Sequence, residues 1–286
     1  MHSVPTPTWD PQQYLRHSGH RSRPFLDLLH RVPALPGGGA RSARPARIAD
    51  LGCGPGKVTA LLADRWPDAH ITGLDNSAEM LAEADRLAGP TAGGGRLDFR
   101  PADAAHWDPA ADGERYDLIV SNAALQWVPG HAGSFPAWIA ALTPGGALAF
   151  QVPGNFTSPS HTLLAGLRAS PRWRERLGGS ARAADGVLEP ARYLELLAGL
   201  GCEVDAWETT YAQLLTGADP VLDWVKGTAL RPTLTALADD EEAREEFLSE
   251  YRDLLREAYP AGPYGTVFPF RRIFVVARKA SEGGER

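Results

Sequence analysis

Short apolar runs alternate with amphipathic helical patterns between residues 47 and 152, and this alternation constrains the fold more than any other feature. Helical patterns cover 58–66, a stretch beginning near Ser77, and 135–142, and the apolar runs cover 47–51, 71–74, 97–100, 116–121 and 147–152. Continuous apolar strands separated by helices are typical of a parallel sheet covered on both faces. Right-handed crossovers then predict a doubly wound sheet, whose ligand crevice lies at the carboxyl ends of the strands.

The chain beyond residue 152 is less regular. Two strand-like stretches, 202–214 and 272–277, are separated by helical patterns, which we place at 160–173, 190–200, 220–237 and 240–259. We expect one α/β domain over residues 1–286, with a doubly wound, mostly parallel seven-stranded sheet, an antiparallel last strand and an inserted helical cap. Its expected parts are an N-terminal lid segment at 1–31, a cofactor-binding core at 32–152, and cap insertions with the last two strands at 153–286.

The composition narrows the classes of partner. With 22% charged residues, a formal net charge of -6 and no long run of Lys and Arg, a nucleic-acid partner is not expected. Cys53 and Cys202 have neither metal-type nor disulfide spacing, so we expect reduced thiols and no metal. The sequence shows no signal peptide and no membrane span, which predicts a cytoplasmic location without a membrane partner; it leaves the oligomeric state open.

A glycine-rich motif from Ala49 to Gly56 lies where the first predicted strand turns into a helix. Glycine permits the tight turn and a close ligand approach, and the helix N-terminus supplies free N–H donors. The third glycine comes one residue earlier than in a dinucleotide-binding motif, and Asp50 precedes the loop. A carboxylate there suits a ligand with an ammonium group, such as the methionine part of S-adenosylmethionine; a glycine turn without a ligand is the alternative.

Acidic residues follow the next two predicted strands. Asp75 is placed to accept hydrogen bonds from ribose hydroxyls, although nicotinamide enzymes place an acid similarly. Asp103 and Ala104 are placed to contact an adenine edge, with a solvated loop as the alternative for Asp103. The fourth strand ends at Asn122 and leads to Trp127, which is either a wall between cofactor and acceptor or a plain core residue.

With these motifs the chain resembles the class I methyltransferases and, nearly end to end, the trans-aconitate 2-methyltransferase family. The motifs outside the cofactor loop that carry the closer resemblance include Trp9-Asp10-Pro11, Arg21-Ser22-Arg23-Pro24, Asp223-Trp224-Val225, Leu230-Arg231-Pro232 and Phe268-Pro269-Phe270-Arg271-Arg272. The chain departs from the family pattern at His17, where an aromatic residue is expected, and in its longer glycine-rich loops.

The resemblance implies methyl transfer from S-adenosylmethionine to a carboxylate of trans-aconitate, which gives a monomethyl ester and S-adenosylhomocysteine. A carboxylate with a pKa of about 4 is already ionised at pH 7, so no general base is required. Arginines suit such a small polycarboxylate. The candidate acceptor-binding residues are Arg21, Arg23, Trp127, Arg231, Tyr264 and Arg271. The candidate cofactor-binding residues are Tyr14, Asp50, Gly52, Cys53, Gly54, Asp75, Asn76, Met80, Asp103, Ala104, Asn122 and Trp127.

Two alternatives stay open from the sequence. One is a small-molecule O- or C-methyltransferase with a different acceptor, for which His20 or His131 would serve as base. The other is a catalytically silent cofactor-binding module that acts through a protein partner. Turnover with candidate acids, compared with cofactor binding alone, discriminates among the three.

Overall fold

A computed structural model describes residues 18–38, 42, 44–111, 113, 115–177 and 186–281 of the chain. Internal contacts divide the chain into two compact units. Of the described residues, the sheet unit comprises those within 18–153, 186–209 and 272–281, and the helical unit comprises those within 154–177 and 210–271. Within the described ranges, no helix has the length and apolarity needed to cross a membrane.

The sheet is mixed, with a parallel centre. In the described part of the chain nine strands pair in the order β3-β4-β2-β1-β5-β6-β9-β7, and β8 pairs with β9. Neighbours from β4 to β6 are parallel, and β9 is antiparallel to β6. The strands are β1 (Arg47–Leu51), β2 (His70–Asp75), β3 (Gly89–Pro90), β4 (Arg96–Pro101), β5 (Tyr116–Asn122), β6 (Leu142–Pro153), β7 (Cys202–Leu215), β8 (Ala261–Gly262) and β9 (Gly265–Lys279).

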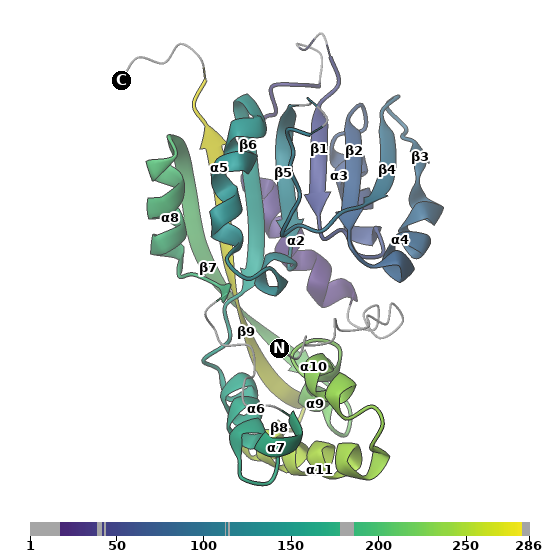
Figure 1. Ribbon diagram of the computed structural model, residues 1–286, viewed down its shortest axis with the longest axis vertical. Helices are drawn as coiled ribbons and strands as arrows, with labels where there is room; N and C mark the ends of the chain where they lie inside the picture. The colour runs from purple at the N-terminus through teal and green to yellow at the C-terminus, as the bar shows by residue number, and fades with distance from the viewer. Residues whose placement is uncertain are drawn as a thin grey trace. The chain divides into compact units, whose positions relative to one another are not determined.

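This arrangement confirms the predicted doubly wound sheet with an antiparallel last strand. The strand count differs from the predicted seven because β3 and β8 are two-residue strands that pair with the ends of longer ones. Such short segments carry no periodicity of their own. Figure 1 shows the arrowheads of β1, β2 and β5 at the same edge of the sheet, so the segments that follow these strands share that edge.

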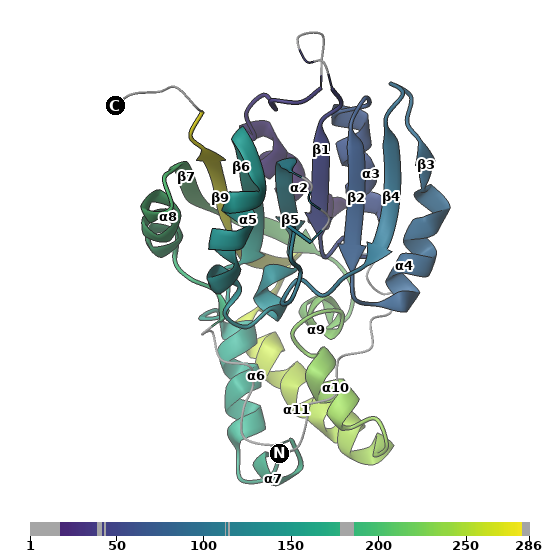
Figure 2. The ribbon, with the colours of Figure 1, turned by 45° about the horizontal axis from the view of Figure 1, so that its top comes forward.

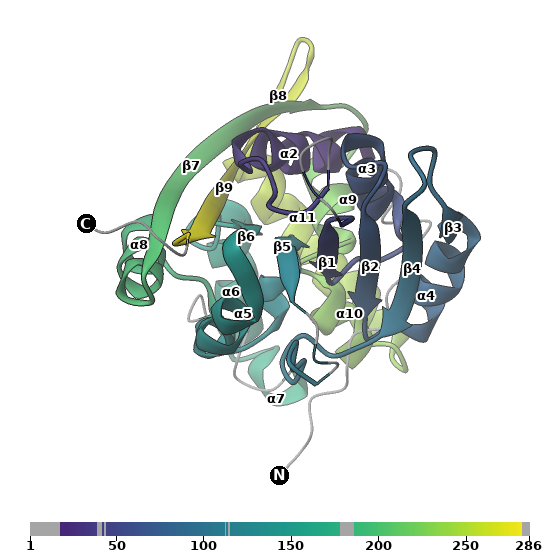
Figure 3. The same ribbon diagram turned by 90° about the horizontal axis from the view of Figure 1, so that it is seen from above.

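Helices cover both faces of the sheet unit, with α2 and α3 on one face and α5 on the other (Figure 3). Residues of α5 and α8, among them Trp138 and Tyr193, share one apolar core with Phe150 of β6. Phe25 and Leu28 of α2 are fully buried in this unit. The helices are α2 (Ser18–Arg31), α3 (Lys57–Arg65), α4 (Ala78–Ala84), α5 (Phe135–Ala141), α8 (Pro190–Gly199) and the 3-10 turns Asp85–Leu87, Leu125–Trp127 and His131–Ser134.

The helical unit has its own core, in which Trp173, Trp224 and Phe247 are almost completely buried. Helices α6 and α11 pack against each other (Figure 2), and the Tyr251 hydroxyl of α11 donates to the carbonyl of Ser160 in α6. The helices are α6 (Pro159–Ala169), α7 (Arg174–Leu177), α9 (Pro220–Lys226), α10 (Arg231–Ala236) and α11 (Glu241–Ala258).

Two predicted helices are shorter than their sequence patterns. The pattern over 160–173 ends at Ala169, because Ser170 precedes Pro171 and adopts an extended conformation. The pattern over 220–237 divides into α9 and α10. A cap at Gly227 ends α9, and Pro232 lies in the first turn of α10, where its missing N–H costs nothing.

Candidate functional site

The glycine loop, residues 52–56, connects β1 to α3 and is held by contacts on two sides. The N–H groups of Gly52 and Cys53 both donate to the carbonyl of Leu74 in β2, at 2.7 and 3.0 Å. Gly52 has a φ of 73°, and a Cβ added to it would lie 2.2 Å from the Cβ of Ala124. The loop is therefore fixed between the end of β2 and the segment that follows β5.

Gly54 gives the loop an open face. Its φ is 55°, and among the described residues, chain neighbours aside, no atom lies within 4 Å of the place where a Cβ would stand. The helix that follows has Gly56 as its N-cap, without a hydrogen bond from a capping side chain. A ligand can therefore approach the backbone of this loop closely, as the sequence motif requires.

Asp75 ties the loop to the next helix. Its Oδ2 accepts from the N–H of Gly54 at 2.8 Å, and its Oδ1 accepts from the N–H of Ser77 at 2.9 Å. The Ser77 hydroxyl accepts from the N–H of Met80 and caps α4. Each carboxylate oxygen has further acceptor capacity, so the side chain can also accept from ligand hydroxyls.

Asp50 is a buried acid, 1% exposed, behind the same loop. Its Oδ2 accepts from the hydroxyl of Thr59 at 2.7 Å, whereas its buried Oδ1 has no partner among the described residues. Burial raises the pKa of Asp50 to about 7; the Thr59 hydrogen bond opposes this shift and the nearby Asp75 carboxylate adds to it. An unsatisfied buried oxygen of this kind fits a cationic ligand group, which would stabilise the ionised form.

Asp103 lies in the turn that follows β4, with its side chain 46% exposed. Its Oδ1 accepts from the N–H of Ala105 at 3.0 Å, and its Oδ2 lies 3.0 Å from Nδ1 of His106. The Ala105 N–H lowers the pKa of Asp103, burial opposes that shift, and His106 adds to it. The carboxylate therefore stabilises its own turn, in which Ala104 is half-buried.

The segment after β5 lies against the glycine loop through Ala124. Asn122, 8% exposed, ends β5, and Ala123 adopts a φ of 55°, which is disfavoured for a residue with a side chain. The Gln126 amide donates to the carbonyl of Ala123, and the half-buried Trp127 ends the short helix that follows. The structure thus brings Asn122 beside the loop that Gly52 begins.

The remaining predicted residues lie as follows. Cys53 and Met80 are buried and Asn76 is exposed, while Tyr14 and the side chain of Arg21 lie outside the described residues. Thr59, which bonds Asp50, was not predicted from the sequence. The signal for it was a hydroxyl on the buried face of the helix that follows the glycine motif.

The predicted acceptor-binding residues belong to both units. Arg23 in α2 has a side chain that is 74% exposed, 4.0 Å from Asp27. In the helical unit, Arg231 begins α10, Tyr264 is 81% exposed between β8 and β9, and Arg271 donates to the carbonyl of Gly154 at 3.0 Å. Their roles, like those of the cofactor residues, stay predictions.

His131, the alternative base, is held inside the sheet unit. It is 1% exposed, its Nε2 lies 2.8 Å from the hydroxyl of Tyr193, and its Nδ1 lies 3.2 Å from the carbonyl of Val128. Burial lowers the pKa of His131, against the opposing effect of the Val128 and Leu125 carbonyls. This environment favours a structural role that anchors the segment after β5 to α8.

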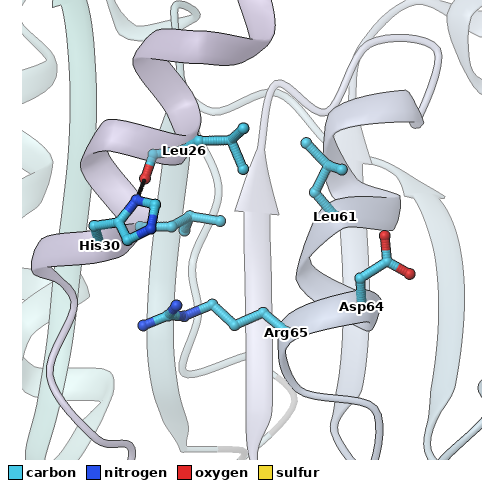
Figure 4. A pocket seen from close by; sticks show the side chains of 6 residues that line it. Leu26, His30, Leu61, Asp64 and Arg65 are labelled. Atoms are coloured by element: carbon cyan, nitrogen blue, oxygen red, sulfur yellow. Dashed lines mark hydrogen bonds between the residues drawn. The ribbon is translucent and has the colours of Figure 1, made fainter.

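A cavity of about 390 Å³ lies elsewhere in the sheet unit, between α2 and α3 (Figure 4). Leu26, Leu29 and His30 line it from α2, and residues 61, 64 and 65 line it from the end of α3. The glycine loop instead precedes the start of α3, so this cavity is separate from the candidate cofactor site.

Comparisons with known proteins show the family and the fold of the chain. A family model described as a methyltransferase domain matches residues 48–146, the part that carries the glycine loop, Asp75 and Asp103. The YjhP protein of Escherichia coli is similar in structure, with a TM-score of 0.52 and 21% identity over 94% of this chain and 100% of that chain. At that identity the likeness concerns the fold alone.

Relatives in sequence are much more similar. A trans-aconitate 2-methyltransferase of Streptomyces avermitilis is 65% identical over 96% of this chain and 97% of its own length. A protein of the same name from Rhodococcus jostii is 50% identical over 94% of this chain and 99% of its own length. The chain therefore belongs to the trans-aconitate 2-methyltransferase family.

Proposed function

We propose that the chain transfers the methyl group of S-adenosylmethionine to a carboxylate of trans-aconitate, which yields the monomethyl ester and S-adenosylhomocysteine. The observation that carries this proposal is the open face of Gly54 between two acids, one of which has an unsatisfied buried oxygen. The names of the relatives supply the acceptor.

The residues around the glycine loop fit the chemical groups of the cofactor. Asp50 Oδ1 is a buried anionic acceptor suited to the ammonium of the methionine part, and Asp75 is suited to the ribose hydroxyls. The cofactor supplies a methyl group activated by its sulfonium. Asp103 and Ala104 are proposed to contact the adenine, and no metal is proposed to take part.

The acceptor needs to be held and shielded rather than deprotonated. Its carboxylate is ionised at neutral pH, with a pKa of about 4. The protein's task is to align the attacking oxygen and exclude water, which contributes up to roughly 7–11 kcal/mol when alignment is good. Arg21, Arg23, Arg231 and Arg271 are proposed to hold the carboxylates, and Trp127 and Tyr264 are proposed to contact the acceptor. The burial of His131 does not favour this residue as the base of an alternative reaction. The side chain of His20, the other candidate base, lies outside the described residues.

The proposed function is tested by incubating the protein with radiolabelled S-adenosylmethionine and trans-aconitate, with citrate as a second polycarboxylate. We expect label in a trans-aconitate methyl ester, and at least about a tenfold rise in KM for Arg231→Ala or Arg271→Ala, since a bond to a charged group is worth roughly 1.5–3 kcal/mol. Arg96→Ala, which removes a surface pair with Asp98, should leave KM unchanged. Label in no acid would contradict the proposal.

The cytoplasmic location stays a prediction, which cell fractionation would test.

A further inference from the structure

A row of three buried polar side chains crosses neighbouring strands of the sheet unit. Arg272 of β9 donates from Nη1 to Oε1 of Gln151 at 3.1 Å, and Gln151 of β6 donates from Nε2 to Oδ1 of Asn122 at 2.5 Å. The three residues are only 7%, 1% and 8% exposed. Asn122 and Gln151 are direct partners in the register of β5 and β6. The row thus ends at the last residue of β5, beside the glycine loop.

The chemistry of the row fixes its direction. A guanidinium has hydrogen-bond donors and no acceptor, so Gln151 has to present its oxygen to Arg272 and its amide nitrogen to Asn122. Asn122 therefore presents its oxygen to Gln151 and turns its own Nδ2 away. Among the described residues none accepts a hydrogen bond from this nitrogen, and Nδ2 is absent from the fully buried atoms that lack a partner. It is a donor with residual exposure.

The position of this donor is fixed relative to the cofactor loop. The carbonyl of Gln151 accepts from the N–H of Ala123 at 2.9 Å, and Ala123 is held at a φ of 55°. The next residue, Ala124, packs against Gly52 of the loop. A strained residue that its neighbours hold in place is typical of a functional segment.

We propose that Asn122 donates from Nδ2 to a carboxylate oxygen of the bound ligands, and that Gln151 and Arg272 are positioning residues that fix its amide in this orientation. The proposal rests on the proposed function, because the two carboxylates available are that of the acceptor and that of the methionine part of the cofactor. The amide N–H₂ of Asn122 can donate to either carboxylate. A reversed amide would instead place the Asn122 Oδ1 against a carboxylate oxygen, and neither atom can donate.

Two substitutions replace the outward-facing donor of Asn122 by an acceptor with little change in side-chain shape. Asn122→Asp still accepts from Gln151 but replaces the outward donor by an anionic oxygen. Gln151→Glu still accepts from Arg272 but no longer donates to Asn122, so the Asn122 amide should turn and present its oxygen. For each variant we expect a loss either in kcat/KM for the acceptor or in affinity for S-adenosylhomocysteine measured by calorimetry. The loss should be about 10- to 100-fold, as for a bond to a charged group.

A double-mutant cycle separates positioning from a structural role. In an Asn122→Ala background Gln151 has no amide to orient, so adding Gln151→Glu should change the affected constant by less than about twofold. If Gln151→Glu causes the same loss with and without Asn122, the positioning role of Gln151 is overturned. If kcat/KM and affinity are both unchanged in Asn122→Asp, the role of Asn122 as a donor is overturned. Thermal unfolding of each variant identifies losses that come from misfolding.

The two measurements also keep this inference distinct from the proposed function. A loss in kcat/KM for the acceptor assigns the bond to the acceptor carboxylate, and a loss in affinity for S-adenosylhomocysteine assigns it to the cofactor. Both outcomes support the inference. If the unsubstituted protein does not methylate trans-aconitate, the proposed function fails, and calorimetry alone then decides. Unchanged affinity in that case would overturn the inference as well.

Discussion

Replacing Gly52 by alanine is expected to destabilise the protein and to remove cofactor binding. The residue has a φ of 73° and its added Cβ would lie 2.2 Å from the Cβ of Ala124. The left-handed conformation costs about 1–2 kcal/mol for a residue with a Cβ, and relieving the overlap costs roughly 1–3 kcal/mol more. Because the loop and the segment after β5 must move apart, affinity for S-adenosylhomocysteine should fall at least about 100-fold. Denaturant unfolding and calorimetry measure the two effects.

Two other glycines with positive φ are matched controls, since in the described part of the chain neither has an atom, beyond its chain neighbours, within 4 Å of an added Cβ. Gly54→Ala, at a φ of 55°, should cost only the conformational strain, but its methyl group would fill the open face and weaken binding. Gly94→Ala, at a φ of 86° in the loop before β4, should cost similar stability and bind normally. Normal binding by Gly52→Ala would contradict the geometry of the loop.

Asp117→Ala is expected to cost about 2–4 kcal/mol, because it leaves buried donors such as the Thr143 hydroxyl without an acceptor, at about 1–3 kcal/mol each. The Arg44 side chain is 45% exposed, so water can hydrate its charge in the variant. The Asp117 carboxylate is fully buried and accepts from Nη1 and Nη2 of Arg44 at 2.7 and 2.8 Å. It also accepts from the Gly37 N–H, the Arg47 N–H and the Thr143 hydroxyl, at 3.1, 2.9 and 2.9 Å. One side chain thus joins the start of β1, the start of β5 and the turn in β6. Asp98→Ala, which removes only a partly exposed pair with Arg96, serves as the control, with an expected change within about 1 kcal/mol.

The same carboxylate makes stability depend on pH. Burial alone would raise the pKa of Asp117, but the Arg44 side chain, the Arg47 N–H and the Thr143 hydroxyl outweigh burial and lower it. Its contribution is therefore fully present above the unfolded-state pKa of about 3.9 and is lost as pH falls through the lower folded-state value. Unfolding at neutral and acidic pH should show this loss in the unsubstituted protein and a smaller one in Asp117→Ala. Equal stability of the two proteins at pH 7 would contradict the role of Asp117.

The central sheet could be predicted because its strands are buried on both faces and therefore read as continuous apolar runs. The glycine motif likewise identified the turn between β1 and α3, where local backbone geometry dictates the residues. The division of 220–237 into two helices depends on the local cap at Gly227, which an apolar helical pattern conceals.

The polar contacts of the site were harder to predict, because they join residues far apart in the sequence. Gln151 lies in a run that reads as an apolar strand, and its partners Asn122 and Arg272 are 29 and 121 residues away. Its polar side chain at the end of that buried strand was the available signal. The unsatisfied oxygen of Asp50 depends on burial, which the sequence does not specify.

The most direct test of carboxylate methylation without a protein base is the single-turnover rate with ¹³C-methyl-labelled S-adenosylmethionine and saturating trans-aconitate. Saturating cofactor should keep Asp50 ionised, although its pKa is about 7 without a ligand. The rate should then vary by less than about twofold between about pH 6.5 and about pH 8.5, because acceptor carboxyls with a pKa of about 4 are ionised throughout. The product's carbon resonance should be that of a methyl ester. A rate that climbs through a histidine-like pKa of about 6.5, or a labelled product that is not an ester, would contradict the account.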